Sequence, residues 1–348
     1  MTSNANFPSP LQPGSIRRKA VSRTNQDLIK MSHLASTTSL PLVITPNVKE
    51  LDLFSWASVQ KEHLETLLLE KGALLFRDFN VNSIEEFERF IKTVSGDLLE
   101  YTQRSSPRSQ VAGRIYTSTD YPPDQSIFLH NENSYQSSWP LKIFFFCVTP
   151  AEQGGETPLA DCRKVQARLD PKILAQFAEK GVMYVRNYGQ GLGLSWQTAF
   201  QTEERAKVEE YCQKNNIQVE WRDGQRLRTR QVLPAFRKDP RTGELLWFNH
   251  ATFFHASSLA PEIRKTLFAE LAEEDLPTNS YYGDGSQIEA SVLDELRAAY
   301  HAETISFPWQ RTDILMLDNM RVAHGRNPFS GSRKVVVGMS EICSADRA

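Results

Sequence analysis

The stretch IFFFCV at residues 143–148 indicates the fold most clearly. Six consecutive apolar residues, mostly aromatic or β-branched and free of glycine and proline, are typical of a buried strand. Similar short runs recur at residues 182–188, 245–248, 314–317 and 335–337, and turn-rich loops separate them. Helical patterns between these runs do not alternate regularly with them. We therefore predict a mostly β core with helices attached, rather than a parallel α/β sheet.

Two helical patterns precede this core. Apolar side chains at helical spacing, followed by Gly72, predict a helix over residues 58–71. The pair Ser83 and Glu86 forms a capping-box pattern at the start of a second helix. The run ALLF at residues 73–76, between the two helices, predicts a further buried strand.

Length, composition and charge exclude several classes of protein. The chain has 348 residues, of which 40% are hydrophobic and 24% charged, as expected of a globular protein with an ordinary core. A net charge of −2 argues against nucleic acid as a partner. No long apolar run or secretory signal is evident, so we expect a cytoplasmic protein that does not bind membranes. Four scattered cysteines indicate reduced thiols.

The domain organisation follows from where the patterns begin. Residues 1–40 are rich in Ser, Thr and basic side chains but poor in apolar periodicity, which favours a flexible arm over a transit peptide. We expect a single domain with helical insertions over residues 41–342, and a short tail at 343–348. The oligomeric state is left open by the sequence.

A candidate metal site lies in FLHNENSY at residues 128–135. In an extended chain His130 and Glu132 lie two residues apart and so share one face. His324, which follows the predicted strand at 314–317, is the best candidate for a third ligand. Two histidines and one carboxylate leave three positions open on Fe(II). Alone, however, an HxE pair is more often an accidental surface pair.

Other constellations are weaker. His250 and His255 are five residues apart, a spacing that does not place them on one face of a strand or helix. Asp318 could in principle supply the carboxylate in place of Glu132. The glycines at 189–193 read GxGxG, and no regular βαβ pattern follows them, so we expect a loop and no nucleotide site.

Several motifs in order resemble one known family. They are HNENSY (130–135), GGETPLAD (154–161), WFNH (247–250), YGDG (282–285), and DN, AHGR and GSRK within 318–334. From about residue 41 to 339 the chain resembles the TauD/TfdA family of Fe(II)/2-oxoglutarate oxygenases. Within that family it is most similar to the SyrP-like branch associated with nonribosomal peptide biosynthesis. The resemblance implies a double-stranded β-helix, a relative of the jelly roll.

The resemblance also implies roles for individual residues. The implied iron ligands are His130, Glu132 and His324. Thr157 and Arg333 match the positions that hold 2-oxoglutarate, and an arginine fork suits a carboxylate. Arg333 lies nine residues after His324, a shorter interval than in several family members, so Arg326 is kept as an alternative.

The implied activity is hydroxylation of an unactivated C–H bond, with Fe(II), 2-oxoglutarate and O2. Glu132 argues against halogenation, because related halogenases have a small residue there, whereas desaturation or cyclisation stays open. The implied substrate is an amino acid or its derivative, free or tethered to a peptidyl carrier protein. Rival hypotheses are a non-catalytic cupin-like binding module and, less favoured, a zinc hydrolase.

Substrate-binding residues are the least specified. Arg104 and Arg108 could pair with a substrate carboxylate, although two solvated loop cations are the simpler interpretation. Gln125 and Ser126 precede the HxE pair and could line the pocket. Three alternating arginines at 226–230 would share one face of a strand, which predicts either an anion-binding surface for a carrier protein or a solvated strand edge.

Overall fold

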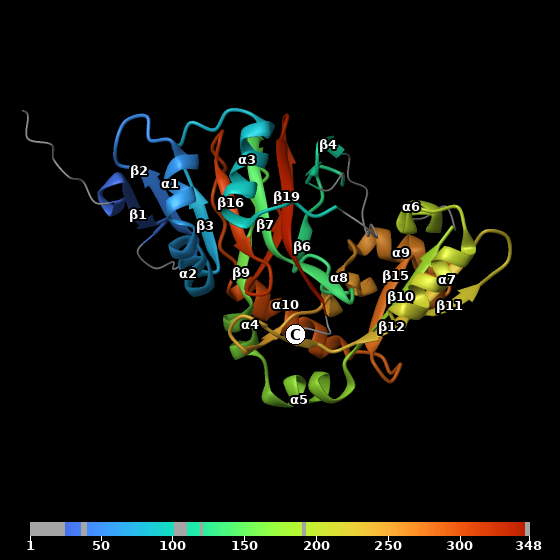
Figure 1. The fold of residues 1–348 in the computed structure, drawn as a ribbon. Helices are drawn as coiled ribbons and strands as arrows, with labels where there is room; N and C mark the ends of the chain where they lie inside the picture. Colours follow the sequence, from blue (N-terminus) through green and yellow to red (C-terminus); the bar gives the residue numbers. More distant parts are fainter. Residues whose placement is uncertain (1–24, 36–39, 101–109, 119–120, 190–192, 345–348) are drawn as a thin grey trace, which may run out of the picture.

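A computed structural model describes residues 25–35, 40–100, 110–118, 121–189 and 193–344 (Figure 1). Its largest element is an eight-stranded sheet. All neighbouring strands in this sheet are antiparallel except β2 and β3. The strand order is β1 (Ile29–His33), β2 (Leu42–Pro46), β3 (Ala73–Phe76), β16 (Ile314–Asp318), β7 (Ser138–Thr149), β19 (Lys334–Ser344), β5 (Ile115–Thr117) and β4 (Gln110–Ala112).

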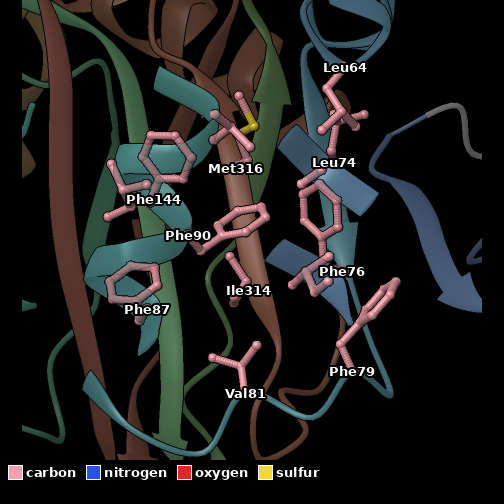
Figure 2. Packing of buried hydrophobic residues seen from close by; sticks show 14 of the residues in the cluster. Leu64, Leu74, Phe76, Phe79, Val81, Phe87, Phe90, Phe144, Ile314 and Met316 are labelled. Atoms are coloured by element: carbon pink, nitrogen blue, oxygen red, sulfur yellow. The ribbon is translucent and has the colours of Figure 1, made fainter. Parts of the chain in front are cut away.

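The predicted strand at 143–148 is confirmed as part of β7, a central strand buried on both faces. Phe144 and Phe146 pack into an apolar cluster under helices α1 (Leu53–Val59), α2 (Lys61–Lys71) and α3 (Ile84–Ser95), part of which Figure 2 shows. Phe145 and Cys147 belong to a second cluster on the opposite face. An unbroken apolar run, without alternation, is what such a doubly covered strand requires.

The N-terminal helices differ from the prediction in one respect. The predicted helix over 58–71 is two helices that meet at Gln60, and Val59 is exposed and makes no part of the core. Gly72 ends α2 with a φ of 80°, as predicted. Ser83 caps α3 by accepting a hydrogen bond from the N–H of Glu86 at 3.2 Å, which confirms the predicted start. The carboxylate of Glu86 accepts from Asn82 instead of Ser83.

A three-stranded sheet covers the inner face of the main sheet. It is built from β6 (Ile127–His130), β17 (Val322–Arg326) and β9 (Leu159–Asp161), with β8 (Gln153–Gly154) and β18 (Phe329–Ser330) paired beside it. Leu159 and Val322 share the second apolar cluster with Phe145. At Gly325 a Cβ atom would lie 2.5 Å from the carbonyl oxygen of Ile127, so β6 and β17 approach too closely for a side chain there.

The remaining elements lie beside the main sheet and at one end of it (Figure 1). A four-stranded sheet has the order β11 (Gln218–Trp221), β12 (Leu227–Leu233), β10 (Val182–Tyr188), β15 (Thr278–Tyr282). The hairpin of β13 (Phe236–Lys238) and β14 (Leu245–Trp247) follows. The helices are α4 (Cys162–Arg168), α5 (Pro171–Lys180), α6 (Trp196–Phe200), α7 (Arg205–Lys214), α8 (Ala251–Phe254), α9 (Pro261–Glu270) and α10 (Ala290–Ala302). The predicted class, mostly strands with helices, is confirmed.

Part of the segment predicted as a flexible arm has regular structure. Residues 25–28 form a 3-10 helix, and β1 pairs with β2 at the edge of the main sheet. Residues 1–24 and 36–39 lie outside the described residues. All four cysteines are buried, and none of them forms a disulfide. None of the helices in the described ranges has the length and apolar character needed to cross a membrane.

Candidate active site

Three predicted ligands converge between the two facing sheets. His324 on β17 lies opposite His130 on β6 in the antiparallel register, and Glu132 follows in the turn after β6. Their ligand atoms all lie within 4.8 Å of one another. The described part of the chain contains no other group of three or more His, Cys, Asp or Glu side chains with this geometry. Imidazole nitrogens and a carboxylate oxygen at these separations can share one metal ion.

Hydrogen bonding orients the first histidine. Nδ1 of His130 lies 2.8 Å from the carbonyl oxygen of Phe128. Because a carbonyl only accepts, Nδ1 carries the proton and Nε2 keeps the lone pair that a metal needs. The rings of Phe253 and Phe145 lie 4.6 Å from the ring of His130 and 5.2 Å from that of His324, respectively. These apolar contacts fix the imidazole planes and exclude water from one side of each.

A cavity continues from the two histidines to Thr157 and Arg333. Arg333 donates from Nε to the carbonyl of Gly155 at 2.8 Å and from Nη1 to Oγ of Ser118 at 3.1 Å. Among the described residues, no carboxylate forms an ion pair with this guanidinium within 4.0 Å. Burial, together with the neighbouring charge of Arg326, lowers the pKa of Arg333 to about 10, so it stays charged at neutral pH.

Arg333 is therefore a half-buried cation in the cavity of the candidate metal ligands, and Glu156 acts on it without forming an ion pair. A largely desolvated charge is costly unless an opposite charge pairs with it. The far carboxylate of 2-oxoglutarate would supply that charge, and the near end of the molecule would reach the histidines. The residues present thus fit this cosubstrate.

Thr157 is held by a residue that sequence reasoning missed. Nε1 of Trp309 donates a hydrogen bond to Oγ1 of Thr157 at 3.1 Å, and both side chains are buried. Since the hydroxyl oxygen accepts from the indole, the hydroxyl hydrogen is directed to another acceptor. Ser118, the acceptor of Arg333, was also missed, and neither residue belongs to a recognisable motif.

Arg326, the alternative to Arg333 as the cation for 2-oxoglutarate, bonds main-chain carbonyls instead. Its guanidinium donates to the main-chain carbonyls of Tyr121, Pro122 and Gln125 at 3.0, 2.6 and 2.8 Å. These bonds fasten the segment that leads into β6. The side chain of Gln125 is half-buried and that of Ser126 exposed. The predicted substrate residues Arg104 and Arg108 lie outside the described residues.

The competing candidates are occupied elsewhere. Asp318 forms a buried ion pair with Arg241 at 2.7 Å and takes no part in the cluster of ligands. His255 bonds through Nδ1 to Ser257 at 2.7 Å. His250, in contrast, lies beside the site, with its ring centroid 5.7 Å from that of His130. Burial lowers the pKa of His250 well below its usual value, so a neutral imidazole stands next to the candidate ligand.

Neither interpretation of the arginines at 226–230, an anion-binding surface or a solvated strand edge, is confirmed, because β12 lies between β11 and β10. Arg226 precedes β12, and Arg228 is buried, with Nη2 bonded to Asp275 at 2.5 Å. Nη1 of Arg230 pairs with Glu220 at 2.8 Å. Acidic side chains from neighbouring segments thus neutralise the arginines. A sequence window cannot show these partners because they lie on other strands and loops.

Comparisons with known proteins agree with this geometry. The chain is 42% identical over 276 residues to dapdiamide synthesis protein DdaC of Enterobacter agglomerans, covering 79% of this chain and 84% of DdaC. It is 30% identical over 292 residues to a clavaminate synthase-like protein of Arabidopsis thaliana, covering 80% and 84%. Each alignment covers more than three quarters of this chain.

The fold is shared with solved structures. PvcB from Pseudomonas aeruginosa aligns with a TM-score of 0.54 at 14% identity, covering 92% of this chain and 93% of PvcB. A second structure of PvcB, an Fe, alpha-ketoglutarate dependent oxygenase from an isonitrile synthetic pathway, gives a TM-score of 0.52 at 14% identity, with 94% of each chain covered. The model of the taurine catabolism dioxygenase TauD, TfdA family matches residues 36–339. The chain belongs to this family and is a non-haem Fe(II)/2-oxoglutarate-dependent dioxygenase.

Proposed function

We propose that this dioxygenase hydroxylates an unactivated C–H bond of an amino acid or amino-acid-derived substrate. His130, Glu132 and His324 hold the iron in this proposal, and Thr157 and Arg333 hold 2-oxoglutarate. One observation carries it: a single cavity joins the two histidines to a half-buried arginine that forms no ion pair with an acidic side chain among the described residues. The proposal also takes the main sheet and the sheet β6-β17-β9 as the two walls of a double-stranded β-helix.

Each side chain has a distinct part in the proposal. When bound, Fe(II) and 2-oxoglutarate supply the oxidising chemistry, in which O2 and 2-oxoglutarate yield succinate, CO2 and one oxygen atom inserted into substrate. The protein contributes three ligands on one face and leaves the other positions for cosubstrate and oxygen. Arg333 neutralises the far carboxylate and Thr157 donates a hydroxyl hydrogen bond to it. Phe145 and Phe253 keep water from the histidines.

The type of pathway is inferred from the relatives. DdaC is a dapdiamide synthesis protein, and 42% identity over most of both chains supports a role for this chain in specialised, antibiotic-type biosynthesis. We extend this to an amino-acid-like substrate, either free or tethered to a peptidyl carrier protein.

The proposal is tested first without any substrate. Anaerobic titration of the purified chain with Fe(II) and then 2-oxoglutarate should give one metal site and a charge-transfer absorption that depends on both. His324→Ala should lose both signals while it keeps the thermal transition of the wild type. Unchanged iron binding by folded His324→Ala would overturn the ligand assignment.

Substrate and reaction type are then tested together. The chain is incubated with candidate amino acids, each supplied free and as a carrier-protein thioester, and succinate and product mass are recorded. Hydroxylation adds one oxygen atom, whereas desaturation or cyclisation removes two hydrogens. If succinate forms only with substrate and the product has lost two hydrogens, the reaction is desaturation or cyclisation and not hydroxylation. Ligand binding with no succinate under any condition would contradict turnover of these substrates.

A further inference from the structure

The turn between β16 and β17 contains a buried asparagine, Asn319, that contacts the main chain of Glu132. Its side-chain oxygen accepts a hydrogen bond from the N–H of Glu132 at 2.8 Å. Its side-chain nitrogen donates to the carbonyl oxygen of Glu132 at 2.9 Å. A carboxamide that bonds both main-chain groups of one residue replaces the pairing that an adjacent strand would provide. The segment that leads to His324 therefore fixes the backbone at Glu132.

Every polar group of Asn319 is used at this junction. The side-chain nitrogen also donates to the carbonyl of Pro140 at 2.8 Å. The main-chain N–H donates to the carbonyl of Leu141 at 2.9 Å, and the main-chain carbonyl accepts from Nδ2 of Asn131 at 2.7 Å. Asn319 is fully buried, so water cannot replace a lost partner. The residue ties the turn after β6, strand β7 and the turn before β17 into one unit.

The geometry accounts for the residue type. Aspartate has the same shape and keeps the acceptor for the N–H of Glu132, but it loses both donors. It also places a negative charge against two carbonyl oxygens, those of Glu132 and Pro140. Alanine would leave the N–H of Glu132 and the carbonyl oxygens of Glu132 and Pro140 without their side-chain partner. A one-atom-longer glutamine would have to displace the turn.

We propose that Asn319 is the positioning residue of the metal centre. It holds Glu132 where its carboxylate meets His130 and His324, and it thereby sets the affinity of the site for divalent metal. The inference rests on the proposed function, since the three side chains must be the ligands. Residues that orient metal ligands in this way typically change metal affinity by about 10- to 100-fold when replaced.

The chain offers a matched control, Asn187 on β10. Its side chain is also buried and also makes three hydrogen bonds. It donates to the carbonyls of Glu274 and Leu276 at 2.9 and 2.7 Å and accepts from Nε of Arg228 at 2.9 Å. These bonds join β10 to β12 and to the segment that precedes β15, and none of them involves a candidate ligand. Asn187→Ala should therefore cost similar stability with no effect on metal affinity.

The experiment measures Mn²⁺ affinity of the full chain by electron paramagnetic resonance titration, with thermal stability recorded in parallel. We expect Asn319→Ala and Asn319→Asp to bind Mn²⁺ at least about tenfold more weakly than wild type, and Asn187→Ala to bind as wild type does. The isosteric Asn319→Asp keeps the test valid if Asn319→Ala does not fold.

The outcomes separate this inference from the proposal beneath it. If His324→Ala loses Mn²⁺ and both Asn319 variants bind within twofold of wild type, the positioning role is refuted and the ligand assignment stands. An equal loss of Mn²⁺ affinity in Asn187→Ala would also refute the positioning role, because a general loss of stability would then explain the weaker binding. If His324→Ala itself binds as wild type does, the ligand assignment fails first.

Discussion

Replacing Arg333 by alanine removes a cation from the cavity that His130 and His324, the proposed metal ligands, also line. Its Nε and Nη1 are already bonded to Gly155 and Ser118, while Nη2 makes no hydrogen bond to any described residue. The proposed cosubstrate carboxylate would pair with this free side of the fork. A hydrogen bond to a charged group contributes about 1.5–3 kcal/mol, so the apparent 2-oxoglutarate affinity should fall by about tenfold to a hundredfold.

The assay is titration of 2-oxoglutarate into the iron-loaded protein under anaerobic conditions, with the metal affinity measured separately. Arg333→Ala should weaken 2-oxoglutarate binding and leave metal affinity unchanged, because no ligand atom is altered. The 2-oxoglutarate affinity of Arg333→Lys should lie between those of Arg333→Ala and the wild type, since lysine keeps the charge but loses the planar fork.

The matched comparison is Arg326→Ala in the same cavity. Its guanidinium is occupied by three main-chain carbonyls, so the variant should lose thermal stability more than 2-oxoglutarate affinity. If Arg333→Ala binds 2-oxoglutarate as wild type does while Arg326→Ala abolishes binding, the assignment of the cosubstrate cation is wrong.

Three further outcomes are expected. Glu132→Ala should abolish succinate formation in folded protein, and turnover at more than a small fraction of wild type would contradict its role as a ligand. Phe144→Ala and Phe145→Ala should each destabilise the fold by about 3–5 kcal/mol, but only Phe145→Ala should weaken metal binding, because Phe145 contacts His324. Burial raises the pKa of the thiols of Cys147, Cys162 and Cys212 from 9.0 to about 12, so these thiols should resist alkylation until the chain unfolds. The free energy of unfolding should fall as the pH rises from about 9 to 12, because in this range only the thiols of the unfolded chain ionise. A free energy of unfolding that does not change over this range would refute the prediction.

Local rules sufficed for part of the molecule. The apolar run at 143–148 is a doubly buried strand, and Ser83 caps a helix, because both depend on neighbours within a few residues. His130 and Glu132 do lie close together as predicted, but Glu132 lies in the turn after β6 and not in an extended strand, so the alternation argument reached the right pair for a different reason. The break at Gln60 was missed because both helices carry apolar residues in phase with a single longer one.

Long-range partners were beyond such rules. Asn319 bonds Glu132 across 187 residues, and Trp309 bonds Thr157 across 152. The DN pair at 318–319 was noted as part of a motif, but nothing in a linear sequence says which main chain an amide will meet. The same limit produced the error at Arg228, whose acidic partner Asp275 lies 47 residues away.

The antiparallel sheet explains how residues so far apart in sequence form one site. Strands β6 and β17 bring His130 and His324 into register, and β9 on the other side of β17 follows directly after Thr157 and Pro158. Arg333 immediately precedes β19, which pairs with β7, and β7 contributes Phe145 to the wall behind His324. Strand pairing thus brings the candidate ligands, the proposed cosubstrate cation and the apolar wall close together. A change in register of β17 would move His324 away from His130, and the close approach at Gly325 and the amide of Asn319 lie near the two ends of this strand.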